Sequence, residues 1–182
     1  MEYVSRAGEK LAHALKEFKV DVTGKTCADF GSSTGGFVDA LLQAGASKVY
    51  AVETGYGIVD WKIRKDERVV VMERTNAMHV ELPEQVDFLS VDTSWTRMKN
   101  VLPNAVKQIK KDGQMIVLIK PHYEAEPSDL VKGVLPEDKV EDVIERVKQD
   151  ISALGLNVLN STESPIKGKK GGNTEYLLLI SQ

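Results

Sequence analysis

Two ionisable side chains directly follow apolar segments of the sequence and could together move a proton. Lys120 comes after the apolar run at 114–119, and Asp92 comes after the apolar run at 86–91. If both runs are neighbouring parallel strands, these side chains meet at the same edge of the sheet. A partly buried lysine beside a second cation can lose its proton and act as a general base, and Asp92 would orient it.

A second pair of opposite charges could complete the same site. Lys10 lies on the amphipathic segment 5–18, and Glu175 stands at the start of the last apolar run, at 176–180. In this arrangement Lys10 would be the second cation near Lys120, and Glu175 would orient Lys10. The alternative, which the sequence leaves open, is that both pairs are structural ion pairs at strand ends.

A glycine-rich turn between an apolar run and a helix-like segment could hold a nucleotide-type cofactor. The stretch 29–37 reads Asp-Phe-Gly-Ser-Ser-Thr-Gly-Gly-Phe. Glycines let backbone amides approach a ligand closely, and a helix N-terminus favours anionic groups. Glu53 ends the next apolar run, at about the spacing where an acidic residue binds ribose hydroxyls in dinucleotide folds. The alternative is a tight strand-to-helix turn without a ligand.

The same stretch lacks the patterns of phosphate-rich cofactors. The Gly-Lys-Ser/Thr ending of an ATP loop is absent, and Ser33 replaces the second glycine that makes room for a pyrophosphate. S-adenosylmethionine has no phosphate and carries an ammonium and a sulfonium, which suit an acidic residue such as Asp29. We therefore expect S-adenosylmethionine as the cofactor, with a nicotinamide-dependent oxidoreductase as an alternative.

The residues after the run at 86–91 restrict what could be methylated. They read Asp92-Thr93-Ser94-Trp95, whereas enzymes that methylate exocyclic amines typically carry Asn/Asp-Pro-Pro-aromatic at this place. Enzymes that methylate a pyrimidine carbon use a cysteine nucleophile, but Cys27 lies inside the first predicted strand. A hydroxyl acceptor with a lysine base remains.

Apolar runs alternate with helix-like segments along the chain, which predicts an α/β fold. Strands are predicted at 26–30, 48–53, 69–72, 86–91, 114–119, 157–160 and 176–180, and helices at 5–18, 37–44, 97–110 and 139–154. This alternation indicates a doubly wound, mostly parallel seven-stranded sheet, whose ligands bind beyond the carboxyl ends of the strands. The residues at those ends are 31–37, Glu53, 73–76 with Asn76, 92–95 and 120–124. Two segments rich in Gly, Pro and charge, 121–136 and 164–174, are expected to be loops over that edge.

Length and composition fit one globular domain over residues 1–182, in which 1–20 form an N-terminal helical extension. The chain has 182 residues, a net charge of −3 and 42% hydrophobic residues. We expect a cytoplasmic protein, because no apolar run approaches the ~18 residues of a membrane helix and no secretory signal is present. The single cysteine, Cys27, fits a reducing compartment. Three scattered histidines and one cysteine predict no metal site.

The sequence resembles the FtsJ-like RNA 2′-O-methyltransferases, and within them the hemolysin A-like (TlyA) branch. The resemblance spans nearly the whole chain in order. It is carried by the stretches 3–11, 29–37, 55–64, 73–76, 118–124 and 173–176, which read YVSRAGEKL, DFGSSTGGF, GYGIVDWKIR, ERTN, LIKPHYE and NTEY. It implies a Rossmann-like class I methyltransferase fold with an antiparallel last strand, and methyl transfer from S-adenosylmethionine to a ribose 2′-hydroxyl, in rRNA.

The resemblance also implies residue roles. The Lys-Asp-Lys-Glu tetrad of the family falls on Lys10, Asp92, Lys120 and Glu175. The implied cofactor residues are Asp29, Gly31, Ser32, Ser33, Thr34, Gly35, Gly36, Phe37, Glu53, Asn76 and Asp92. The branch usually has Asp at the place of Glu53 and Phe at the place of Trp95. It also carries a small ribosomal-protein-like RNA-binding domain at its N-terminus, which we expect this chain to lack.

Basic and aromatic residues could contact RNA around the predicted site. The basic ones are Lys62, Arg64, Lys65, Arg68, Lys167, Lys169 and Lys170, and the aromatic ones are Tyr56, Trp95 and Tyr123. Such cations bind backbone phosphates, and aromatic rings stack on unpaired bases. Trp61 is expected in the core instead. The alternative to an enzyme is a non-catalytic RNA- or cofactor-binding module on the same fold.

Overall fold

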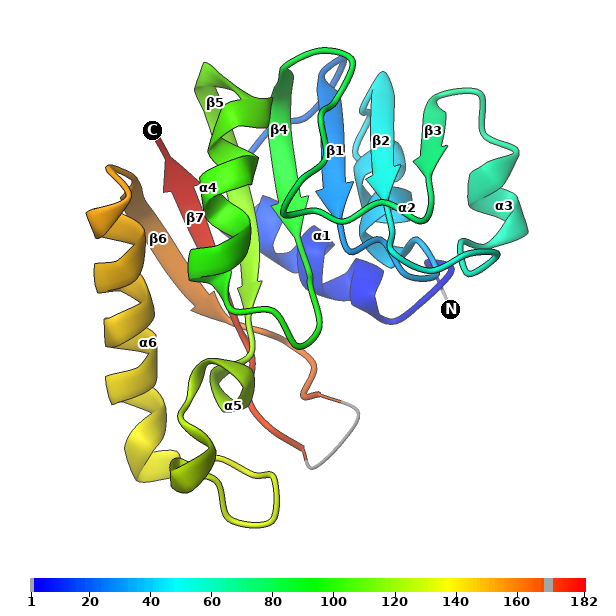
Figure 1. The fold of residues 1–182 in the computed structure, drawn as a ribbon. Helices are drawn as coiled ribbons and strands as arrows, with labels where there is room; N and C mark the ends of the chain where they lie inside the picture. Colours follow the sequence, from blue (N-terminus) through cyan, green and yellow to red (C-terminus); the bar gives the residue numbers. More distant parts are fainter. Residues whose placement is uncertain (1, 169–171) are drawn as a thin grey trace.

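The computed structural model describes residues 2–168 and 172–182, which form one seven-stranded sheet with helices on both faces (Figure 1). The strands are β1 (Thr26–Phe30), β2 (Lys48–Val52), β3 (Val69–Met72), β4 (Val86–Val91), β5 (Ile109–Ile119), β6 (Asn157–Glu163) and β7 (Tyr176–Ser181). The helices are α1 (Ala7–Glu17), α2 (Gly36–Gln43), α3 (Trp61–Arg64), α4 (Met98–Gln108), α5 (Pro121–Glu124), the 3₁₀ turn η1 (Pro127–Asp129) and α6 (Glu137–Ala153).

The strand order β3-β2-β1-β4-β5-β7-β6 confirms the predicted doubly wound sheet. Strands β1 to β5 pair in parallel. Parallel neighbours need crossover connections, which run over the faces of the sheet. Strand β7 pairs antiparallel with both β5 and β6. The start of β7 therefore lies beside the end of β5, where Tyr176 faces Ile119. This reversal brings Glu175 to the edge at which the parallel strands end.

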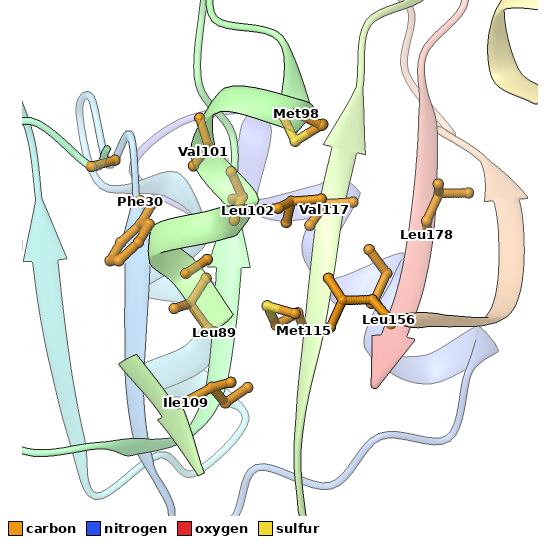
Figure 2. Packing of buried hydrophobic residues seen from close by; sticks show 14 of the residues in the cluster. Phe30, Leu89, Met98, Val101, Leu102, Ile109, Met115, Val117, Leu156 and Leu178 are labelled. Carbon is orange, nitrogen blue, oxygen red and sulfur yellow. The ribbon is translucent and has the colours of Figure 1, made fainter. Parts of the chain in front are cut away.

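Helices cover both faces of the sheet and enclose two apolar cores. Helices α1 and α2 lie on one face, and α4 and α6 lie on the other (Figure 1). The core under α4 and α6 contains buried side chains such as Leu89, Leu102 and Met115, which Figure 2 shows between α4 and the sheet. The core under α1 and α2 contains Leu11, Leu41 and Ile116 among others. Strand β5 supplies side chains to both cores, as predicted for a buried central strand.

Three predicted strands match the structure residue for residue: 26–30, 69–72 and 86–91. Strands β5 and β6 are longer than predicted. The first part of β5 was not predicted, because residues 110–112 are polar and interrupt the apolar pattern. Ile109 nevertheless pairs with Val86 of β4. The segment 121–136 is not a plain loop, because it contains α5 and η1. Proline stands in the first turn of both short elements, where its missing N–H needs no partner.

The prediction for Trp61 is wrong. Its side chain is 67% exposed at the start of α3, and the neighbouring Ile63 supplies the buried contact instead. Because α3 has only four residues, a single side chain can face the core, and Ile63 takes that place. Lys65 lies over the Trp61 ring, with 5.0 Å between its Nζ atom and the ring centroid.

Candidate active site

One cavity of about 650 Å³ opens at the edge where β1, β2, β4 and β5 end and β7 begins. Its walls include all four residues of the predicted tetrad, namely Lys10, Asp92, Lys120 and Glu175. They also include Asp29, Gly31, Ser32, Ser33, Thr34, Phe37, Glu53 and Asn76. The structure therefore brings most of the residues singled out in the sequence to one place.

The tetrad forms two ion pairs. Lys120 Nζ lies 2.5 Å from Asp92 Oδ1, and the two side chains are 12% and 18% exposed. Lys10 Nζ donates to Glu175 Oε2, and this second pair is more deeply buried. The pairing of each lysine with its carboxylate is the one expected from the order of the strands. Each carboxylate lies beside the end or the start of a strand, while Lys10 reaches the edge from α1.

The turn after β1 is pressed closely against β4. Gly31 adopts φ +88°, and a Cβ atom at this position would lie 2.9 Å from the carbonyl carbon of Asp92. The amides of Gly31 and Ser32 both donate to the Val52 carbonyl, at 2.9 and 3.1 Å. Only glycine fits both the backbone angle and the space here. The backbone angle and the lack of space thus explain why the motif has glycine at position 31.

The next two glycines of the motif serve packing. Gly35 and Gly36 are not among the cavity-lining residues that the structure describes, and their expected contact with the cofactor stays a prediction. A Cβ atom at Gly35 would lie 2.9 Å from Ile63, and one at Gly36 would lie 2.9 Å from the amide nitrogen of Gly8. These glycines let α2 begin close to α1 and α3, which fixes the direction of the turn.

Glu53 forms hydrogen bonds to the loop after β1 and to the loop after β2, in the wall of the cavity. Its Oε2 atom accepts from the Ser33 amide at 2.8 Å, and its Oε1 atom accepts from the Gly55 amide at 2.7 Å. A carboxylate oxygen has more than one lone pair, so these bonds leave acceptor capacity for ligand hydroxyls. The expected ribose contact of Glu53 is therefore compatible with its position in the wall.

Asp29 is buried in the same cavity and has an unsatisfied oxygen. Ser90 Oγ donates to Asp29 Oδ1 at 2.7 Å, whereas Oδ2 has no hydrogen-bond partner among the described residues. Burial raises the pKa of the Asp29 carboxyl to about 7, and the charges of Asp92 and Glu53 add to this effect. A free carboxylate oxygen among further carboxylates suits a ligand with positive charge. The ammonium and sulfonium of S-adenosylmethionine fit that requirement, whereas a pyrophosphate does not.

Replacing Asp29 by Asn should remove a pH-dependent loss of stability. An acid whose pKa is raised by folding is protonated in the folded chain and ionised in the unfolded chain between about pH 4 and 7, so stability falls with rising pH across this window. A shift of about three units corresponds to roughly 4 kcal/mol. Urea unfolding without cofactor should show that the free energy of unfolding of the wild type falls by several kcal/mol from pH 4.5 to pH 8 relative to that of the variant.

Asp87→Asn is the matched control for this experiment. The hydrogen bond from Lys110 is the main reason that the pKa of Asp87 lies below its usual value. Asp87 therefore contributes stability that is lost only as the pH falls below the ordinary aspartate range, so its replacement should leave the difference between pH 4.5 and 8 nearly unchanged. Equal curves for wild type and Asp29→Asn would show that Asp29 is ionised in the folded chain throughout.

An aromatic group lies at the outer side of the cavity. The rings of Trp95 and Tyr123 are 5.2 Å apart, and those of His122 and Tyr123 are 4.1 Å apart. Trp95 is 76% exposed and adopts φ +66°. Burial, with the charge of Lys120 adding to it, lowers the pKa of His122. The structure thus places two of the predicted aromatic residues, with His122, beside the Lys120–Asp92 pair.

The cavity also includes residues that sequence reasoning did not single out for it. Ser5, Arg6 and Ala7 precede Lys10 and line the same wall. Arg6 donates to the carbonyl oxygen of Lys167, so the start of the chain is joined to the segment before β7. The signal for these residues was present in the motif 3–11, which carried the resemblance without an assigned role beyond Lys10.

Three of the basic residues predicted to contact RNA do not line the cavity and are already in ion pairs. Lys62 pairs with Asp39, Arg64 with Glu73 and Arg68 with Asp66. Lys169 and Lys170 lie outside the described residues. Within the described ranges, no group of His, Cys, Asp and Glu could hold a metal ion, and no helix is long and apolar enough to span a membrane.

Comparison with known proteins identifies relatives over the whole chain. Hemolysin A of Brachyspira hyodysenteriae is 40% identical over 97% of this chain and 76% of its own length. The 16S/23S rRNA (cytidine-2′-O)-methyltransferase TlyA of Mycobacterium tuberculosis is 37% identical over 98% of this chain and 68% of its own length. A solved structure from Lactococcus lactis, of a protein named as a hemolysin, superposes with a TM-score of 0.94 at 43% identity, covering 99% of this chain and 88% of that chain.

The family model for FtsJ-like methyltransferases matches residues 3–181. This range contains every element of the sheet and all four residues of the tetrad. The fold, the glycine-rich turn and the unsatisfied acidic oxygen agree with the S-adenosylmethionine dependence of that family. The chain is therefore a member of the FtsJ-like methyltransferase family.

Proposed function

We propose that this protein transfers a methyl group from S-adenosylmethionine to a ribose 2′-hydroxyl of rRNA. The observation that carries the proposal is the position of the Lys120–Asp92 pair in the wall of the cavity that Gly31 and Asp29, with its buried unsatisfied oxygen, also line. A proton-transfer group and a site for a cationic cofactor thus share one space. An rRNA substrate also implies a cytoplasmic location.

The cofactor side of the cavity is formed by the first two loops of the sheet. Asp29 would bind the ammonium group through its free oxygen, and Glu53 would bind ribose hydroxyls of the cofactor. Asn76 and Phe37 line the same cavity. S-adenosylmethionine supplies a methyl group that the sulfonium already activates, so the protein needs to align the acceptor and remove its proton.

The acceptor side is formed by the tetrad. In its neutral form Lys120 accepts the proton of the ribose 2′-hydroxyl, and Asp92 stabilises the resulting ammonium across 2.5 Å. The buried Lys10–Glu175 pair holds a second positive charge next to this site and positions the acceptor ribose. Trp95 and Tyr123 offer ring surfaces on which a base of unpaired RNA can stack.

Mass mapping of rRNA tests the proposal directly. The protein is incubated with S-adenosylmethionine carrying a deuterated methyl group and with naked rRNA, small subunits or large subunits in separate reactions. Nuclease digestion should then yield a ribose-methylated nucleoside with the heavy label, at a defined position. The comparison of the three reactions identifies whether the partner is free rRNA or a ribosomal subunit.

The other functions have distinct results in the same experiment. A label on a base would contradict ribose methylation. Absence of label, with S-adenosylmethionine binding retained in calorimetry, would favour a non-catalytic module. Binding of NAD without binding of S-adenosylmethionine would favour an oxidoreductase.

A further inference from the structure

Two of the four tetrad residues and the ring pair stand on two separate loops at the acceptor side of the cavity. The first follows β4 and contains Asp92 and Trp95, and it ends where α4 begins at Met98. The second follows β5 and contains Lys120, directly before α5, and Tyr123, within α5. Function requires Asp92 to remain beside Lys120 and Trp95 to remain beside Tyr123. Something must therefore fix the distance between these loops.

Glu124 connects the two loops at their far ends. Its side chain is buried, and Oε1 accepts from the Met98 amide at 2.8 Å. The N-cap residue of α4, Arg97, makes no capping bond with its side chain. The first amide of α4 is thus satisfied by a carboxylate from α5, at the helix end that favours negative charge.

Neighbouring contacts hold Glu124 in this position. Arg146 of α6 donates to the Glu124 carbonyl oxygen at 2.6 Å. Arg97 donates to the Ala125 carbonyl oxygen at 3.0 Å and to Glu126 Oε1 at 3.0 Å. Donors at the start of α4 therefore bind acceptors at and just after the end of α5, and Arg146 of α6 adds a third donor.

The hydrogen bonds of α5 transmit this anchor to Lys120. The amides of Tyr123 and Glu124 both donate to the Lys120 carbonyl oxygen, at 2.8 and 3.3 Å. Lys120 is therefore one helical turn from the anchored carboxylate. On the other loop, five residues separate Asp92 from Met98, and one of them is Trp95, with φ +66°. Loss of the anchor would free both the strained tryptophan and the lysine.

We propose that Glu124 is a positioning residue that sets the spacing of the two acceptor loops through its bond to the Met98 amide. It acts through Lys120, Asp92 and the Trp95–Tyr123 ring pair rather than by touching the substrate. This inference rests on the proposed function for its effect on turnover. Its structural part, the control of Trp95 by Glu124, can be measured without any RNA.

The first test is a fluorescence measurement on three variants in a Trp61→Phe background, in which Trp95 is the single tryptophan. Glu124→Ala should raise the local mobility of Trp95 in time-resolved anisotropy, because the Met98 amide loses its acceptor. Glu124→Gln keeps an acceptor oxygen and should retain most of the wild-type order. Glu126→Ala is the matched control: it removes only the exposed ion pair with Arg97, keeps the bonds from Met98 to Glu124 and from Arg97 to the Ala125 carbonyl, and should leave Trp95 unchanged.

The second test separates the two sides of the cavity. Glu124→Ala should lower kcat/KM for rRNA at least tenfold while the Kd for S-adenosylmethionine in calorimetry changes less than twofold. Retained cofactor binding also shows that the variant is folded. Unchanged Trp95 anisotropy and turnover in Glu124→Ala would overturn the inference, and so would equal loss of cofactor binding. If the wild type methylates no RNA, the proposed function fails, whereas the anisotropy result still decides the role of Glu124.

Discussion

Replacing Lys120 by Met should reduce the rate of methyl transfer to rRNA by about a hundredfold to ten-thousandfold, which is the usual contribution of a general base. Methionine keeps most of the length of the side chain and removes the amine. Asp92 then loses the partner that lies 2.5 Å away, but the contacts of Asp29, Gly31 and Glu53 on the cofactor side remain. The Kd for S-adenosylmethionine should therefore stay within a few-fold of the wild-type value.

Single-turnover transfer of a labelled methyl group, together with calorimetry of cofactor binding, checks this expectation. Lys139→Met is the matched control, because Lys139 forms a similar ion pair with Asp129, at 2.6 Å, in a different part of the molecule. This control should retain turnover, since an exposed ion pair contributes little to stability. Undiminished turnover in Lys120→Met would remove Lys120 from the reaction as the general base.

Replacing Gly31 by Ala should abolish cofactor binding and destabilise the protein by about 3 kcal/mol or more. An L-residue at φ +88° costs roughly 1–2 kcal/mol in backbone strain. The added Cβ atom would also lie 2.9 Å from the carbonyl carbon of Asp92, which forces the turn and β4 apart, and such overpacking costs typically 1–3 kcal/mol. The displacement would move both Asp92 and the turn that faces the cofactor.

Gly24→Ala separates backbone strain from the steric conflict. Gly24 has a similar φ of +69°, but a Cβ atom there meets no other atom within 4 Å. Urea unfolding should show a loss of about 1–2 kcal/mol for Gly24→Ala, with cofactor affinity retained. If the two variants lost equal stability and both bound S-adenosylmethionine, the close approach of Gly31 to β4 would not matter for the site.

The sequence by itself determined the layers of the fold and the edge at which the site lies. Short, largely apolar runs bounded by glycine and charge located β1, β3 and β4 to the residue. Strands β1 and β4 are buried on both faces, whereas the edge strand β3 was marked by its β-branched residues. The rule that ligands bind beyond the ends of parallel strands then selected Asp92 and Lys120. Their contact follows from the adjacency of β4 and β5.

The tertiary structure decided which residues complete the site, which of their atoms are hydrogen-bonded and how exposed they are. The reversal of β7 brings Glu175 to Lys10 across the longest part of the chain, and a pattern of apolar residues does not specify strand direction. The unsatisfied oxygen of Asp29 depends on which neighbours surround it in space. The exposure of Trp61 and the bond from Met98 to Glu124 likewise arise from the packing of short helices. Local sequence sets periodicity and backbone preference, whereas contacts between distant segments are fixed only when the whole chain closes around its two cores.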